Sequence, residues 1–231
     1  MKTSLRWSIF LFWIAIFVSF GTTALLPVPQ AKAQNEKNVH FHWAFGTVKN
    51  TDEGQKFESI TRDAVLKSGD QIKFFVDLKK KCFLYVIYYS SQQELSVLFP
   101  YRFKEQDLTP QPQYIPKGNE WFELDDHAGR EKFYLLGSAE RLTDLEAIVN
   151  KYESADKAKK QELAGQVLAE IRKLRKRHLK MKSYAERPVT IIGNMRGSGN
   201  KEASGNYDVA DFAVEFSADD FFSRTFTIDH Q

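Results

Sequence analysis

The sequence predicts an α+β protein that is mainly β, an antiparallel β-sandwich with an inserted helical hairpin. Aromatic residues make up 14% of the 231-residue chain, with 19 Phe, and such side chains favour pleated, half-buried surfaces. Short alternating segments bounded by turn residues recur between residues 39 and 139 and again after Pro188. Between them, residues 143–186 have the composition and apolar spacing of helices. A chain of this length is enough for one domain with a sizeable core.

Residues 1–33 have the pattern of a secretory signal peptide, which we exclude from the fold. Lys2 and Arg6 precede an uninterrupted apolar run, and Ala31 and Ala33 form the small-residue cleavage pattern, so we expect cleavage after Ala33. The mature protein is then exported, to the periplasm. The alternative is that the apolar run remains as an uncleaved N-terminal helix that anchors the protein in a membrane.

Removing the leader leaves a chain without net charge. Residues 1–33 hold three of the 33 basic residues and none of the 30 acidic residues, so 30 residues of each sign remain. A nucleic-acid-binding domain ordinarily keeps a basic excess. The composition therefore argues against nucleic acid as a partner, and the expected export of the protein is a second argument against it.

Residues 34–60 are expected to form an N-terminal segment ahead of the β domain, which we place at 61–231. The first strand of this segment carries His40 and His42, whose rings share one face of an extended chain. Two imidazoles supply only half of a zinc site, and Cys82 is the only cysteine. We therefore expect no metal, no cofactor and no intramolecular disulfide, and a buried, unreactive thiol.

The next segments predict buried strands. A turn at 68–70 precedes a strand at 71–78, in which apolar residues alternate with polar ones. Residues 83–89 are apolar on both faces, so we expect this strand to be covered on both sides. A polar turn at 90–93 and a second apolar run at 95–99 complete a hairpin, which we interpret as a core element of the sheet.

A long loop and a turn with acidic residues follow. Residues 102–117 are polar and contain three prolines, which predicts the loop, and strands are expected on both sides of the turn. Asp125, Asp126 and His127 in that turn form an acid–histidine cluster of the kind that general acid–base catalysis uses. Because adjacent turn residues do not orient one another reliably, we favour a solvated turn.

Residues 143–186 predict two helices inserted between strands. Thr143 followed by Glu146 has the pattern of a capping box, and Ser154 is a suitable cap for the second helix. An apolar stripe recurs at helical spacing, at Leu163, Val167, Leu168, Ile171 and Leu174.

Further strands are expected after Pro188, around 189–193, 207–218 and 223–231. A Gly- and Ser-rich stretch at 196–206 is interpreted as a flexible hairpin loop, because it lacks the Gly-Lys-Ser/Thr ending of a phosphate-binding loop. The order along the chain is therefore strands, a helical insertion, and strands again.

The run at 171–182 contains seven Lys and Arg residues. Arg172, Lys173, Lys176 and Lys180 are expected to project away from the apolar stripe, and these four are our candidates for a binding site. Such a run binds acidic surfaces, including anionic lipid headgroups. The alternative is a solvated helix face whose charge is balanced elsewhere.

Three segments between residues 66 and 142 carry a recognisable pattern. "LKSGDQIKFFVDLKKKCFLYVIYYSSQQELSVLFP" has a Ser-Gly-Asp turn, a Tyr-rich strand and an apolar strand ending in Phe-Pro, and "YIPKGNEWFEL" and "AGREKFYLLGSAERL" follow. This pattern resembles the bacterial family of a domain of unknown function, DUF4384. The matching residues are Ser68, Gly69, Asp70, Tyr85, Phe99, Pro100, Ile115, Pro116, Gly129 and Glu131. The later "NMRGSG" resembles the family less, since Ser198 stands where the family has Ile.

The resemblance implies an extracytoplasmic or accessory domain, of the kind that is sometimes attached to kinase or caspase-like units. No catalytic residues are established for the family, so none carries over. We therefore expect an exported, non-enzymatic binding or accessory module of the bacterial cell envelope, whose partner is an unknown protein or envelope component. The alternatives are an envelope hydrolase that uses Asp125, Asp126 and His127, and a membrane-anchored sensor domain.

Overall fold

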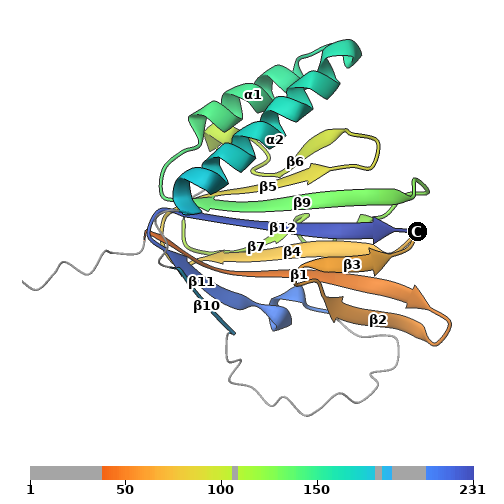
Figure 1. Cartoon of the computed structure of the whole chain (residues 1–231). Coiled ribbons are helices and arrows are strands. Elements are labelled where there is room, and N and C mark those ends of the chain that lie inside the picture. Colours follow the sequence, from red (N-terminus) through yellow and green to blue (C-terminus); the bar gives the residue numbers. More distant parts are fainter. Residues whose placement is uncertain (1–37, 106–108, 180–183, 189–206) are drawn as a thin grey trace, which may run out of the picture. The chain divides into compact units, whose positions relative to one another are not determined.

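The computed structural model of the chain describes residues 38–105, 109–179, 184–188 and 207–231 (Figure 1). The leader, the strand expected at 189–193, the loop at 196–206 and Lys180 lie outside the described residues. The described residues form two β-sheets and two α-helices, which confirms the α+β, mainly β prediction.

The first sheet, sheet A, has the strand order β10-β11-β1-β4-β7, with β2 paired to β1 and β8 paired to β4. All of these pairs are antiparallel. The strands are β1 (Val39–Thr51), β2 (Gly54–Ser59), β4 (Gln71–Leu78), β7 (Pro112–Ile115), β8 (Phe122–Glu123), β10 (Tyr184–Pro188) and β11 (Val214–Ala218). The segment at 34–60, expected ahead of the β domain, thus supplies β1 and β2 to this sheet.

The second sheet, sheet B, has the strand order β3-β12-β9-β5-β6. Its pairs are antiparallel except for β3 and β12, which run parallel. The strands are β3 (Asp63–Leu66), β5 (Phe83–Tyr89), β6 (Leu95–Phe99), β9 (Gly129–Ser138) and β12 (Phe221–His230). The predicted hairpin is confirmed, because β5 pairs with β6.

Aromatic side chains fill the space between the two sheets. Phe45 of β1 stacks on Phe74 of β4 with ring centroids 3.9 Å apart, and both rings contact Phe226 of β12 in the other sheet. Ile72 and Val76 share the inward face of β4 with Phe74, as the alternation of that strand predicts. These rings account for the high Phe content, because side chains from both sheets interdigitate in such a core.

The two helices cover the outer face of sheet B and create a second core. They are α1 (Thr143–Glu153) and α2 (Lys157–Leu179), and Figure 1 shows them side by side next to β5 and β9. Tyr85 and Ile87 face the helices, whereas Leu84 and Val86 face sheet A, so β5 is covered on both sides as predicted. The apolar stripe of α2 packs into this second core, also as predicted.

Both expected helix caps are wrong. Leu142 precedes α1 without a side-chain cap, and the Glu146 carboxylate accepts hydrogen bonds from Tyr85 and Arg141 instead. Ser154 ends α1 and does not begin α2, because its hydroxyl donates to the carbonyl of Asn150 in the last turn of α1. In both cases the side chain makes a hydrogen bond other than the capping bond that the local sequence pattern predicts.

The prolines at 102–117 do not exclude structure there, so the expected loop needs correction. A short 3-10 helix, η1 (Phe103–Glu105), and the edge strand β7 lie within the segment. Pro112 is tolerated at the first position of β7, where a strand can lack one backbone donor. Only four residues of β7 pair with β4, so the segment gives no alternating run long enough to predict a strand.

The strand expected at 207–218 begins instead as a 3-10 helix, η2 (Val209–Phe212), before β11. The Asp208 carboxylate caps η2 by accepting a hydrogen bond from the backbone of Ala210 at 2.9 Å. Val209 packs on the outer face of sheet A against Ala44 and Phe75. This close approach needs a glycine at position 46 of β1, where an added Cβ would lie 2.7 Å from Val209.

Candidate functional site

The C-terminal half of α2 exposes a row of cations. Ile171 and Leu174 are buried against sheet B, and the residues between and after them point to solvent because successive side chains turn about 100° around a helix. We define the basic face of α2 as five exposed residues, Arg172, Lys173, Arg175, Lys176 and Arg177.

The five cations differ in their partners. Lys173 lies 3.0 Å from the nearly buried Glu170 carboxylate, and Arg175 donates to the Thr225 hydroxyl at 3.3 Å. Arg172, Lys176 and Arg177 make no hydrogen bond or ion pair with any other described residue. Three positive charges of the basic face are therefore available to a partner.

The structure describes three of the four binding-site candidates that the sequence predicts. It places Arg172, Lys173 and Lys176 on the exposed face of α2, as helical spacing predicts, and Lys180 lies outside the described residues. The sequence did not single out Arg175 and Arg177. Arg177 follows Lys173 by four residues, so the same spacing argument could have found it.

A cavity of about 520 Å³ lies beside the basic face, between the end of α2, the first turn of α1 and the end of β9. Its lining carries both signs of charge, with the basic residues Arg141 and Arg177 and the acidic residues Glu140, Asp144, Glu170 and Asp220. The acidic residues outnumber the arginines in this lining, so the cavity does not favour an anionic ligand.

His178, which also lines the cavity, contributes little positive charge at neutral pH. Its ring stacks on Phe221 with centroids 4.7 Å apart. Burial lowers the pKa of His178, the neighbouring charge of Arg177 acts in the same direction, and Asp220 opposes both. The charge of this end of α2 therefore comes from Lys and Arg residues.

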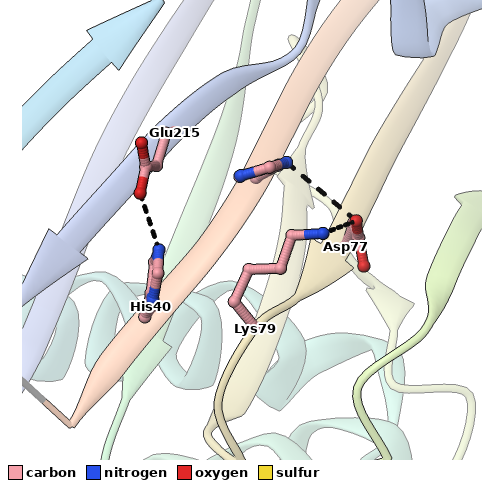
Figure 2. Close-up of polar contacts among 5 residues, drawn as sticks. His40, Asp77, Lys79 and Glu215 are labelled. Carbon is pink, nitrogen blue, oxygen red and sulfur yellow. Dashed lines mark hydrogen bonds and ion pairs between the residues drawn. The ribbon is translucent and has the colours of Figure 1, made fainter. Parts of the chain in front are cut away.

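The histidine pair of β1 lies on the outer face of sheet A. His40 Nε2 is 2.8 Å from Glu215 Oε1, and Figure 2 shows these two side chains pointing toward each other. His42 Nδ1 is 4.0 Å from the Asp77 carboxylate, which is also paired with Lys79. Burial lowers the pKa of His42, with Lys79 adding to the effect, so this ring is mostly neutral near pH 7.

The two imidazoles therefore have separate carboxylate partners. Across the part of the chain that the structure describes, no group of three or more His, Cys, Asp or Glu side chains is arranged to hold a metal ion. Cys82 is buried beside this strand, and burial raises the pKa of its thiol to about 11. The expectation of a buried thiol is confirmed, and the raised pKa disfavours the thiolate form.

The acidic turn is open to solvent. Asp125 and His127 form an ion pair at 3.1 Å with side chains 68% and 63% exposed, and Asp126 is exposed too. The backbone N–H of His127 donates to the Asp125 carboxylate at 2.8 Å, which lowers the pKa of Asp125 and gives the pair the geometry of a local Asx turn. None of the three residues lines the cavity beside α2.

Comparison with known proteins identifies one family. The model of a domain of unknown function, DUF4384, matches residues 65–141. No curated protein and no solved structure matches the chain. The matched part runs from β3 through β9 and ends before α1, so the basic face of α2 lies outside it.

Proposed function

We propose that this chain, which belongs to the DUF4384 family through residues 65–141, is an exported binding module that docks on an anionic surface of the cell envelope. One observation carries the proposal. Arg172, Lys176 and Arg177 are exposed on one helix without an acidic partner among the described residues.

The spacing of these cations destabilises α2, because side chains of like charge lie close together on the helix. Arg172 and Lys176 are four residues apart, as are Lys173 and Arg177, and each such like-charge pair destabilises a helix by about 0.2–0.5 kcal/mol. Within the described part of α2 from Ile171 to Leu179 no acidic residue interrupts the run. A helix with a purely structural role gains nothing from this arrangement, whereas an acidic partner would offset the repulsion.

The shape of the face favours a membrane surface over a specific protein pocket. The cations stand on the outside of a helix, and the cavity beside them has a lining of mixed charge. A convex row of long, flexible side chains suits a flat surface with many anions, such as anionic lipid headgroups. Each Lys or Arg near such a surface contributes about 1 kcal/mol.

The contact would be electrostatic and peripheral. Val167, Ile171 and Leu174 are buried against sheet B, so α2 has no free apolar face to insert into lipid. Attraction without insertion weakens as salt shortens the Debye length, which is about 8 Å at physiological ionic strength. In the described residues, no helix is both long enough and apolar enough to cross a membrane.

The leader pattern of residues 1–33 supports export, and an exported protein would meet an envelope surface. The periplasm is the compartment we propose. The basic face offers exposed lysines and arginines, whose charge suits an acidic partner, so the activity that we propose for it is binding. If the leader stays uncleaved, the same face would act in a membrane-anchored protein.

Vesicle sedimentation tests the proposal. The protein should sediment with vesicles that contain phosphatidylglycerol but not with pure phosphatidylcholine vesicles, and added salt should release it. Binding to an acidic protein without binding to either vesicle would assign the face to a protein partner and overturn the lipid assignment. If the protein binds neither at low ionic strength, the basic face is a solvated surface and the proposal is wrong.

A further inference from the structure

Three side chains from distant parts of the chain line up where the turn before β4 meets the C-terminus. Ser68 Oγ lies 3.1 Å from His230 Nε2, and His230 Nδ1 lies 3.5 Å from Glu131 Oε1. The His230 side chain is fully buried and the Glu131 side chain is 3% exposed, whereas Ser68 is open to solvent. An exposed hydroxyl therefore stands in front of a buried imidazole and a buried carboxyl group.

The turn that carries Ser68 is held firmly. The buried Asp70 carboxylate accepts hydrogen bonds from the backbone N–H groups of Lys67 and Asn50, both at 2.8 Å. The Asn50 side chain in turn donates to the carbonyl of Gly69 at 2.8 Å. These bonds fix the backbone on both sides of Ser68, so the position of its hydroxyl does not depend on a mobile loop.

His230 is held by the sheet. It is the last residue of β12, between Leu66 of β3 and Gly129 of β9 in the strand register. The following residue, Gln231, donates its backbone N–H to the carbonyl of Leu66 at 2.9 Å. The imidazole is thus carried by a strand paired on both sides, next to the strand that leads into the Ser68 turn.

Glu131 has the environment of a group that orients the imidazole. Burial raises its pKa, and the hydrogen bond from the Tyr88 hydroxyl and the neighbouring His230 oppose this effect. His230 Nδ1 and Glu131 Oε2 are buried atoms that have no hydrogen-bond partner among the described residues. A small adjustment that brought Nδ1–H onto the carboxylate would satisfy the imidazole and leave Nε2 free to accept from Ser68.

We propose that Ser68 is a nucleophile that takes an acyl group from an activated carboxylic ester, with His230 as its general base and Glu131 as the residue that positions His230. A nucleophile, a base within hydrogen-bond reach and a third group that orients the base are the parts this chemistry requires. The carboxylate distance of 3.5 Å is long, as such contacts often are without substrate.

The proposed ester hydrolysis has two steps, acylation of Ser68 and hydrolysis of the acyl group. Ser68 Oγ attacks the ester carbonyl, a new O–C bond forms, and the hydroxyl proton passes to His230 Nε2. The bond from the carbonyl carbon to the alcohol oxygen then breaks, and the departing alcohol takes the proton from His230. Water attacks the acyl-Ser68 group in the same way, which returns the serine and releases the carboxylic acid.

The backbone around Ser68 limits the substrates. The N–H groups of Gly69 and Asp70 already donate to the carbonyls of Leu124 and Lys67. Of these three neighbouring N–H groups, that of Ser68 alone has no partner among the described residues, and it is the backbone donor that we assign to the oxyanion. Because loss of a single oxyanion donor commonly slows catalysis by about 100-fold to 1,000-fold, we infer acyl transfer from reactive esters and not amide cleavage.

A fluorophosphonate probe tests the nucleophile directly, because Ser68 Oγ would displace fluoride to form a stable O–P bond. Intact mass and peptide mapping should place one probe on Ser68. Ser68→Ala should remove the label, whereas Ser96→Ala, a control at an exposed serine of β6, should keep it. A serine that only fastens the C-terminal strand would not be labelled, and that result overturns the proposal.

His230 and Glu131 are tested by rates. His230→Gln should slow labelling by about 100-fold or more, the ordinary contribution of a general base. Labelling of the unmodified protein should rise with pH, because a general base accepts the serine proton only in its unprotonated form. Glu131→Gln should change that pH profile as well as the rate, and Asp125, which acts electrostatically on both residues, must be kept unchanged.

The labelling rate of a variant reports on the role of the replaced residue only if the variant folds. If His230→Gln does not fold, the pH profile of the unmodified protein carries the test, and a flat profile overturns the role of His230. Labelling as fast in folded His230→Gln as in the unmodified protein overturns it too.

Discussion

The Tyr85 hydroxyl donates a hydrogen bond to the Glu146 carboxylate at 2.8 Å and so joins sheet B to α1. The same hydroxyl accepts from the backbone N–H of Leu142 at 3.1 Å, just before the helix begins. Arg141 donates to the other oxygen of Glu146 at 2.8 Å. One tyrosine thus satisfies a buried carboxylate and a buried N–H at the start of the helical insertion.

Tyr85→Phe should therefore destabilise the protein although it keeps the ring. The change removes a hydrogen bond to a charged group and leaves the Leu142 N–H without a partner, which should cost about 2 kcal/mol. Urea denaturation measures the loss as a lower midpoint at an unchanged slope. Tyr101→Phe, at a ring that is 50% exposed, is the control and should be nearly neutral. Equal effects of the two changes would mean that the Tyr85 hydroxyl does not support α1.

Ile87→Asp should prevent folding or cost several kcal/mol. Ile87 is 0% exposed between β5 and the helices, so the substitution buries a carboxylate without a partner. Soluble yield and a cooperative thermal transition are the measurements. Ser96→Asp adds the same charge at an exposed position of β6 and should fold normally. A soluble, cooperative Ile87→Asp protein would contradict the position of β5 between two cores.

The sequence predicts the strands better than their partners. Alternation within 71–78 and 83–89 identifies the buried faces correctly, because every second side chain along a strand points to the same face of the sheet. The alternation does not show that β1 pairs with β4, although β2 and β3 lie between them in the sequence. It also does not show that β12 pairs with β9. These pairings depend on contacts between segments far apart in the chain, for which a single sequence gives no signal.

The same limit applies to the two sites. Helical spacing is enough to place Arg172 and Lys176 on the exposed face of α2. The contact between Ser68 and His230 spans 162 residues. Ser68 belongs to a Ser-Gly-Asp turn, which the sequence marks only as a turn, and His230 carries no local pattern. Asp125 and His127 are two residues apart in sequence and are of types used in acid–base catalysis, yet they form an exposed turn. Proximity along the chain was a poor guide to a site assembled by the sheets.

Stability should depend on pH through Glu131. Burial raises its pKa, so the folded protein keeps a proton that the unfolded chain releases near its ordinary pKa of 4.5. The folded state then binds more protons, and stability falls as pH rises from about 4.5 through the raised pKa. Glu131→Gln cannot release that proton. Its free energy of unfolding should therefore improve relative to that of the unmodified protein as pH rises through this window.

Urea denaturation of both proteins at several pH values measures this difference, and the comparison cancels titrations that the two proteins share. Tyr88 and His230 oppose the effect of burial, so the size of the change reports how far they compensate. If the unmodified protein instead gains stability relative to Glu131→Gln as pH rises, the carboxylate is stabilised by its neighbours and the raised pKa is wrong.

The basic face should be needed for binding and not for folding. Replacing Arg172, Lys176 and Arg177 with Gln removes the three unpaired cations and should weaken association with phosphatidylglycerol vesicles by about 3 kcal/mol, or roughly 100-fold. Lys173 is kept, because its loss would leave the Glu170 carboxylate, which is 9% exposed, without its cation. The melting temperature should stay within a few degrees, since the change also relieves like-charge repulsion on the helix.

A control with the same change in net charge separates a specific face from general attraction. Lys104, Lys151 and Lys157 are exposed on η1, α1 and the start of α2, and replacing all three with Gln removes the same charge outside the basic face. This control should bind vesicles nearly as tightly as the unmodified protein. If the two triple variants lose the same affinity, the vesicles respond to net charge alone, and the C-terminal half of α2 is not a docking surface.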